Sequence, residues 1–188
     1  MRNEKVDRRT KYTKMMTKQA LLELIVNQPL SKITVTDICN RADINRGTFY
    51  KYYSDPYDLL QQIENELFLD IKNIFQKSLS IVTNYDFLVQ ILEYIAKNSS
   101  VCKVLFITHG DKDFISRILQ LAHDKTIMEY RATASDATIE SLEMLYIFIS
   151  NGIVGITQNW IQNDMKQDPK ELAELIIRLN SKCTQFLS

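Results

Sequence analysis

Glycine and proline are scarce in this chain, and together they account for seven of its 188 residues. Sandwiches and barrels need turn residues at short intervals, and disordered tails are usually rich in both types, so the scarcity argues against all three. The three cysteines, Cys39, Cys102 and Cys183, lie far apart. They provide neither an even-numbered disulfide framework nor a CxxC metal pair. We therefore expect an all-α protein.

Long apolar runs and catalytic motifs are also missing. No run of 18 apolar residues occurs, and the chain opens with the charged sequence Met1–Lys5 instead of a signal-peptide core. HExxH, GxGxxG, GxSxG and a phosphate-binding loop are all absent. The two histidines, His109 and His123, do not stand at metal-ligand spacing. These absences predict a soluble cytoplasmic protein that is not an enzyme, binds no metal or cofactor and does not associate with membranes.

The overall charge is balanced, but the two ends of the chain differ. Residues 1–53 carry 11 Lys/Arg against 5 Asp/Glu, a net charge of +6, and residues 54–188 carry 12 against 18, a net charge of −6. A basic head on an acidic body is expected where one end meets a polyanion. A charge-rich surface helix is the alternative, so the pattern within the head must decide.

Residues 8–27 form the first predicted helix. Apolar residues at helical spacing, such as Leu21 and Ile25, give it one buried face. Five cations crowd its N-terminal half, where they oppose the helix dipole and so do not serve local stability. An external anion would explain this cluster, which consists of Arg8, Arg9, Lys11, Lys14 and Lys18.

Two short helices follow. Thr34 and Asp37 fit a capping box that starts a helix over 35–42, with its apolar residues on one face. Asn45 is a second N-cap, which starts a helix over 46–52. Two short helices joined by a turn of about three residues are typical of a helix-turn-helix.

The second of these helices has side chains suited to reading DNA. Arg46 stands at its first position, which a recognition helix points into the major groove, and Gly47 lets the backbone approach closely. Thr48 offers a hydroxyl and a methyl group. The alternative is that the aromatic residues here are plain core. We expect Phe49 and Tyr53 to be core and Tyr50 to face DNA, and the pattern leaves Tyr52 open.

At this point the sequence resembles the TetR family of bacterial transcriptional regulators. Ile33–Tyr53 matches the N-terminal signature of that family, and Arg8–Lys11 and Ala20–Leu24 match as well. The resemblance implies a three-helix DNA-binding domain over 1–54 and a helical regulatory and dimerisation domain over 55–188, about nine helices in all. It assigns DNA contacts to Thr36, Arg46, Thr48, Tyr50 and Lys51, with Lys11 near a flanking phosphate. With Gly47 and Tyr52, the predicted DNA-binding set is Lys11, Thr36, Arg46, Gly47, Thr48, Tyr50, Lys51 and Tyr52.

The chain departs from the family pattern at the start of the next helix. The family often has a phosphate-binding lysine there, and this chain has Pro56. Asp55 is an N-cap and Asp58 a first-turn carboxylate, so both would compete with a phosphate for the free amides. Affinity for DNA is therefore expected to rest more on the first helix and Lys51.

The acidic body reads as helices with short breaks. They are expected over 56–80, from 84 to a break at 97–100, over 101–108, 113–130 and 137–163, and from 168 onward. No linker rich in proline or glycine separates head and body, so the helix over 56–80 is expected to belong to both. Gly152 and Gly155 each cost about 1 kcal/mol relative to alanine inside a helix. Two of them in one apolar helix indicate a close approach to another helix.

The last two helices have apolar faces too wide for a solvent-exposed helix. The TetR family dimerises through its last two helices, and the stretch from Asn151 to Trp160 resembles a common C-terminal type in that family. The alternative is that this wide face is the core of a monomer. The predicted dimer interface consists of Ile149, Ile153, Ile156, Leu172, Leu175, Ile176 and Leu179.

A small-molecule pocket is the last expectation for the body. Aromatic and sulfur-containing side chains there fit an apolar cavity with a few polar tips, although ordinary core packing is the alternative. The predicted lining consists of Tyr94, Cys102, Phe106, His109, Tyr130, Met144, Phe148 and Trp160. By resemblance, the expected function is a homodimeric repressor that a small-molecule effector releases from a palindromic operator in double-stranded DNA. The alternatives are an activator or adaptor controlled by a partner protein, and an enzyme with an all-helical body.

Overall fold

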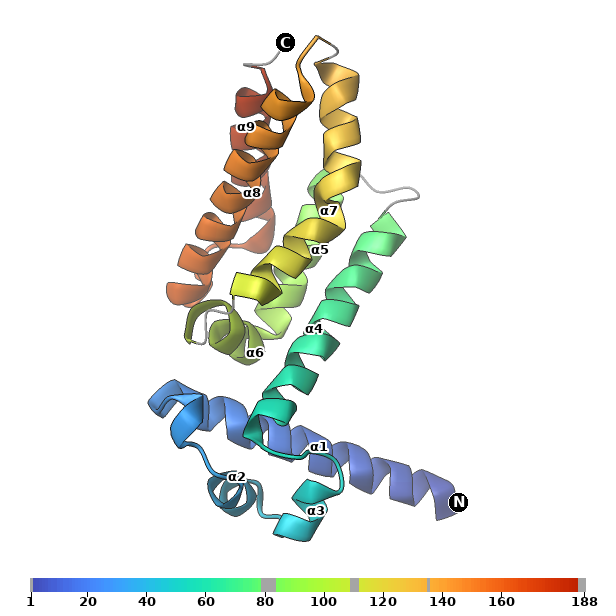
Figure 1. Ribbon diagram of the computed structural model, residues 1–188, viewed down its shortest axis with the longest axis vertical. Helices are drawn as coiled ribbons and strands as arrows, with labels where there is room; N and C mark the ends of the chain where they lie inside the picture. The colour runs from blue at the N-terminus through green and yellow to red at the C-terminus, as the bar shows by residue number, and fades with distance from the viewer. Residues whose placement is uncertain (1, 79–83, 109–111, 135, 186–188) are drawn as a thin grey trace. The chain divides into compact units, whose positions relative to one another are not determined.

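The computed structural model describes residues 2–78, 84–108, 112–134 and 136–185. It divides the chain into two compact units, Met1–Leu67 and Phe68–Ser188. Both units are helical, and no strand occurs in the described ranges (Figure 1). The all-α fold is therefore confirmed.

Nine α-helices occur among the described residues, with one 3-10 turn (η1) and one π-helical turn (η2). In chain order the elements are α1 (Arg2–Asn27), η1 (Leu30–Lys32), α2 (Val35–Ala42), α3 (Arg46–Tyr50), α4 (Pro56–Ser78), α5 (Asn84–Lys97), α6 (Ser99–Lys103), η2 (Val104–Thr108), α7 (Lys112–Thr133), α8 (Ile139–Gln162) and α9 (Pro169–Thr184).

The first unit is built around α2 and α3, which pack with α1 and the first half of α4. Leu21, Ile38, Phe49 and Leu59 are fully buried in its core. The amide of Gln62 on α4 donates to the Tyr52 carbonyl at 3.2 Å. Three short helices bury too little apolar surface by themselves, so α4 completes their core. The units therefore divide inside α4, whereas the sequence placed the domain boundary before it, at residue 55.

The second unit is a helical bundle. α5 packs against α9, and α8 packs against α6, α7 and α9 (Figure 1). The core includes Leu92, Leu105, Leu142 and Ile161, all at most 1% exposed. α8 is long and apolar enough to span a membrane by length and composition alone. Only 22% of its apolar window is buried in the bundle, although α8 packs against three helices.

The middle of the bundle differs from the predicted break at 97–100. Only Asn98 separates α5 from α6, and the helix then continues into the π-helical turn η2. The side-chain amide of Gln158 on α8 donates to the Phe106 carbonyl in this turn at 3.0 Å. π-helical turns leave carbonyls without a regular partner, and here a neighbouring helix supplies one.

Candidate nucleic-acid interface and ligand cavity

Caps and one left-handed residue set the geometry of α2 and α3. The Asp37 amide donates to the Thr34 hydroxyl at 3.2 Å, and the Thr34 amide donates to Asp37 Oδ2 at 2.9 Å, which confirms the capping box. Between the helices, Asp43 adopts the left-handed conformation with φ of 51°. Asn45 then caps α3 by accepting from the Thr48 amide at 2.8 Å. The turn thus holds α3 at a fixed angle to α2.

The outer face of α3 carries the side chains that the sequence assigned to DNA. Phe49 is fully buried and Tyr53 is 2% exposed, whereas Tyr50 is 57% exposed. Arg46, Gly47 and Lys51 are exposed as well. A side chain added at Gly47 would place Cβ 3.3 Å from the capping oxygen of Asn45. The predicted split between core and surface aromatics therefore holds in the structure.

Two predicted residues from different helices meet on this face. The Arg46 guanidinium on α3 donates a hydrogen bond to the Thr36 hydroxyl on α2. Arg46 is exposed and Thr36 half-buried, so the guanidinium lies on the surface next to the hydroxyl. This contact fixes the direction of a cation at the start of α3, where base edges are read in helix-turn-helix proteins.

Tyr52, which the sequence left open, links this face to α1. The ammonium groups of Lys14 and Lys51 lie 5.2 and 5.4 Å from the centre of its ring. Its hydroxyl donates to the Thr10 hydroxyl at 3.4 Å, and this bond and the nearby lysines lower the pKa of Tyr52. The ring therefore gathers two cations on one surface. Sequence reasoning noted Lys14 only as one cation of α1, because nothing in the spacing links it to Tyr52.

The start of α4 has carboxylates where a phosphate would need free amides. The Asp58 amide donates to Asp55 Oδ1 at 2.9 Å, and the Ser54 amide donates to Asp58 Oδ2 at 2.8 Å. The bond from Ser54 holds the pKa of Asp58 below its usual value. These bonds support the expectation that α1 and Lys51, not α4, supply phosphate contacts.

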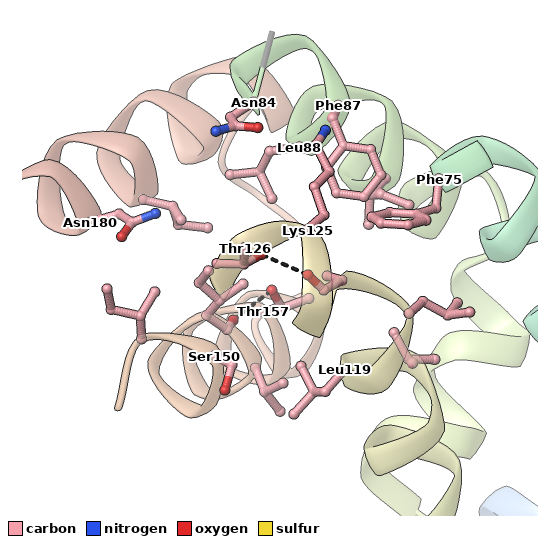
Figure 2. A pocket seen from close by; sticks show the side chains of 18 of the residues that line it. Phe75, Asn84, Phe87, Leu88, Leu119, Lys125, Thr126, Ser150, Thr157 and Asn180 are labelled. Carbon is pink, nitrogen blue, oxygen red and sulfur yellow. Dashed lines mark hydrogen bonds between the residues drawn. The ribbon is translucent and has the colours of Figure 1, made fainter. Parts of the chain in front are cut away.

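The second unit contains a cavity of about 240 Å³. Side chains from α4, α5, α7, α8 and α9 surround it (Figure 2). Most of the lining is apolar. It includes Ile71, Phe75, Phe87, Leu88, Ile91, Ile95, Phe106, Ile118, Leu119, Leu121, Ala122, Ile149, Ile153, Val154, Ile176 and Ile177.

Two of the residues predicted to line a pocket do so, namely Phe106 and Tyr130. Three others have structural partners elsewhere. Tyr94 donates to Asp70 at 2.8 Å, and the Trp160 indole donates to the Gln167 carbonyl at 2.8 Å. Cys102 is fully buried, and burial raises the pKa of its thiol to about 12.

The predicted pocket set needs a further correction on α8. Met144 is 70% exposed and Phe148 is 68% exposed, and neither lines the cavity. Successive helical residues point about 100° apart, so Phe148 faces outward while its neighbour Ile149 faces inward. His109 lies outside the described residues.

The residues predicted to form the dimer interface fall into two groups, one buried or lining the cavity and one exposed. Ile149, Ile153 and Ile176 line the cavity, Leu172 is buried and Ile156 is half-buried. Leu175 and Leu179 on α9 are exposed, at 36% and 48%. We name five exposed apolar or glycine residues in the middle of α8 the α8 stripe, which consists of Met144, Ile147, Phe148, Gly152 and Gly155.

The hydroxyl groups in the cavity wall are bonded to the protein itself. Thr126 donates to the Ala122 carbonyl and Thr157 to the Ile153 carbonyl, each at 2.8 Å (Figure 2). Tyr146 donates to the Leu119 carbonyl at 2.6 Å. These hydroxyl groups therefore donate to helix carbonyls, and a bound ligand would contact mainly apolar atoms of the wall.

Charged side chains enter the cavity lining only from α7 among the described residues. They are Lys125 and Glu129, whose charged atoms lie 3.7 Å apart. The Asn84 amide on α5 donates to the same carboxylate at 3.2 Å. Sequence reasoning missed this group. The available signal was an opposite-charge pair at i and i+4 on the face that also carries Ile118 and Ala122.

His123 joins α7 to α8 beside the cavity. Its two ring nitrogens lie 2.9 Å from carboxylate oxygens of Asp124 and Glu143. Its ring meets the edge of Tyr146 at a centroid distance of 4.9 Å. The hydrogen bonds to the two carboxylates raise the pKa of His123. No group of three or more His, Cys, Asp and Glu side chains suited to a metal ion occurs in the part of the chain that the structure describes.

Known proteins share both the sequence pattern and the fold. A family model of the TetR type, described as a transcriptional regulator C-terminal region, matches residues 83–182, just over half of the chain. The probable acrEF/envCD operon repressor of Escherichia coli strain K12 is 23% identical over 202 residues. That match covers 92% of this chain and 90% of the repressor.

Two solved structures illustrate the similarity in fold. A TetR transcriptional regulator from Streptococcus agalactiae 2603V has a TM-score of 0.65 and 23% identity, and the match covers 95% of this chain and 98% of that one. The regulator FadR from Bacillus subtilis, solved in complex with stearoyl-CoA, has a TM-score of 0.67 and 16% identity. That match covers 88% of this chain and 96% of FadR.

Proposed function

This chain belongs to the TetR family of transcriptional regulators, and on that premise we propose that it is a homodimeric repressor released from a palindromic operator by a small molecule. The observation that carries the proposal is the exposed cationic face on α2 and α3. Capping bonds hold this face in position, and the Arg46–Thr36 hydrogen bond orients its leading cation. A matching repressor from Escherichia coli supports the negative sign of regulation.

On the proposed DNA surface, different residues have different tasks. Arg46 reads a base edge in the major groove, and Thr48 and Tyr50 lie beside it. Lys11, Lys51 and the Tyr52 ring with its lysines bind backbone phosphates, which fixes the register on the duplex. Gly47 keeps the entry to α3 free of a side chain.

A second copy of the chain is the proposed occupant of the α8 stripe. Phe148 and Met144 expose large apolar surfaces there, and an added Cβ at Gly152 or Gly155 meets no atom within 4 Å in the described part of the chain. The glycines therefore leave room for another helix. Leu175 and Leu179 on α9 extend the surface. A two-fold dimer presents two heads to half-sites about 34–36 Å apart.

The cavity in the second unit is the proposed effector site. FadR of similar fold has been solved with stearoyl-CoA, which supports small-molecule binding by this architecture. An effector shifts the population only if it binds the conformation with low DNA affinity more tightly. In this proposal the protein acts in the cytoplasm. It binds and releases the effector without altering it chemically.

The test is an in vitro selection of genomic DNA fragments by the purified protein at near-physiological salt. We expect a motif with two-fold symmetry, because two copies of the head would read two half-sites. Scrambled duplexes should bind weakly and lose affinity steeply as salt rises. Recovery of only salt-sensitive, sequence-blind fragments would contradict the proposal and favour a regulator that needs a partner protein.

A further inference from the structure

We infer that the cavity binds a single-chain organic acid, with its carboxylate at Lys125 and its hydrocarbon chain among the apolar side chains. This inference rests on the proposed function, since it names the chemical class of the effector. It depends on two observations, namely the hydroxyl groups of the wall, which are bonded to the protein itself, and the Lys125 ammonium, which has no hydrogen-bond acceptor in the described ranges.

The wall selects for a hydrocarbon chain. Thr126, Thr157 and Tyr146 donate to helix carbonyls at 2.6 to 2.8 Å, and Ser150 donates to the Ile147 carbonyl at 3.3 Å. A ligand with several polar groups would lose its hydrogen bonds to water here and find few replacements, which is costly. A hydrocarbon chain gains from burial against the apolar lining.

The ammonium of Lys125 is the poorly satisfied group at the polar end. Its contact with Glu129 is 3.7 Å long, beyond hydrogen-bond distance, and no other partner for it lies in the described ranges. Figure 2 shows the side chain rising from α7 toward Phe87 on α5, so its aliphatic part crosses the apolar lining and its charged tip reaches the rim. Its side chain is 29% exposed. A cation that is partly withdrawn from water favours an anionic partner.

The neighbouring polar groups favour an acid over an amine. Glu129 accepts a hydrogen bond from Asn84 at 3.2 Å, so its carboxylate has a donor besides Lys125, whereas no hydrogen-bond acceptor for Lys125 occurs in the described ranges. Figure 2 shows Asn180, whose oxygen accepts from Tyr130 at 3.5 Å, on the opposite side of the cavity from Lys125. The donor at this end is therefore the Lys125 ammonium, from which a carboxylate accepts a hydrogen bond whereas an ammonium group does not.

The size of the cavity limits the length of the ligand's hydrocarbon chain. Its volume of about 240 Å³ lies below the range typical of drug-sized ligand sites. One medium-length hydrocarbon chain suits a space of that size. Decanoate, 1-decanol and decylamine are therefore suitable probes, because they share the chain and differ only in the head group.

The experiment measures the affinity of each probe for the full-length protein by calorimetry, below micelle-forming concentrations and near pH 8. We expect decanoate to bind about tenfold more tightly than decanol, the gain typical of a hydrogen bond to a charged group. Lys125→Met keeps the length of the side chain and removes the charge. This variant should bind decanoate no better than decanol and should keep its affinity for decanol.

Lys97→Met is the matched control, because Lys97 is an exposed lysine on α5 that does not line the cavity. It should retain the preference for decanoate. Equal or tighter binding of decanol or decylamine to the unmodified protein would overturn the inference, and so would a preference that survives Lys125→Met. Absence of binding by all three probes would overturn it as well.

DNA binding by the same preparations separates this inference from the proposed function. If the protein selects a symmetric motif but binds no decanoate, the ligand class is wrong and the repressor proposal stands. If decanoate binds with the Lys125-dependent preference but leaves DNA affinity unchanged, the ligand class stands and effector control fails.

Discussion

The outer face of α3 and the α8 stripe are both exposed surfaces among the described residues of their own units, yet they differ in chemistry. α3 exposes Arg46, Tyr50 and Lys51 around a buried Phe49. The α8 stripe exposes Phe148 at 68% and carries two glycines at which an added Cβ would meet no atom of the described chain within 4 Å. The first surface suits a polyanion and the second suits another apolar helix.

The difference teaches how the two surfaces are built. The proposed DNA surface on α3 depends on individual hydrogen bonds, such as those of Asn45 and Arg46, that fix the direction of single polar groups. The stripe depends on shape and apolar area, so many substitutions preserve it while one charge in its middle disrupts it. The predictions below test this contrast.

The largest expected effect comes from Phe148→Asp. In a two-fold dimer this change places carboxylates in the apolar interface, and an uncompensated buried charge costs about 3–5 kcal/mol. The dimer should dissociate in sedimentation equilibrium while helix content stays unchanged. Leu69→Asp is the control, because Leu69 is 54% exposed on α4, outside the stripe. A Phe148→Asp protein that stays dimeric would remove the stripe from the interface.

Arg46→Ala tests the polar surface. We expect a loss of about 1–3 kcal/mol in operator binding, with poorer discrimination against changed base pairs at one position of each half-site. Lys51→Ala removes a cation that the proposal assigns to a backbone phosphate and should weaken binding to all sequences alike. Titrations with operator and scrambled duplexes measure both effects. Unchanged discrimination in Arg46→Ala would exclude Arg46 as a base reader.

Removing one buried tyrosine hydroxyl from each unit compares how well the polar groups in the two interiors are hydrogen-bonded. The buried hydroxyl of Tyr53 has no hydrogen-bond partner among the described residues, and burial raises its pKa to about 12. Tyr53→Phe should therefore stabilise the protein by roughly 1 kcal/mol, about 2–4 °C in melting temperature. Tyr146→Phe should destabilise it by a similar amount, because Tyr146 donates to the Leu119 carbonyl. Thermal melts test both, and shifts of the same sign would contradict the comparison.

The smallest effect is a pH dependence from His123. Its carboxylate partners Asp124 and Glu143 raise its pKa in the folded state, while Tyr146 packs against its ring. The stabilisation is fully present below the unfolded pKa of about 6.5 and is lost as pH rises through the folded value. His123→Gln should therefore lower the melting temperature more at pH 6 than at pH 9. An equal loss at both values would show that the charge contributes nothing.

The sequence predicted the starts of α2 and α3 to the residue, whereas α1 begins at Arg2, six residues before its predicted start. Both helix starts are predicted by their capping residues, because capping depends on a few neighbouring positions in the sequence. These residues are Thr34, Asp37 and Asn45. α2 has the predicted bounds, and α3 ends two residues earlier than expected. Tyr52 stayed open because its surroundings come from α1, some forty positions away.

For the second unit, the sequence predicted where the helices lie but not which face of each helix is buried. α8 is apolar around much of its circumference, so its periodicity does not tell an inner residue such as Ile149 from an outer one such as Phe148. The choice depends on which helices pack around it, and a single sequence does not encode that in any local pattern. The charged pair of Lys125 and Glu129 was readable in principle, since opposite charges on an apolar helix face are uncommon.

The self-bonded hydroxyls in the cavity have an evolutionary consequence. Because Thr126 and Thr157 are satisfied by their own helices, exchanging an apolar neighbour alters the shape of the cavity without stranding a donor. Chain-length preference can then drift through single conservative changes while the polar end stays intact. Under the proposed function, a new effector of different chain length would then need only apolar substitutions in the wall, and these leave the helix hydrogen bonds of both threonines in place.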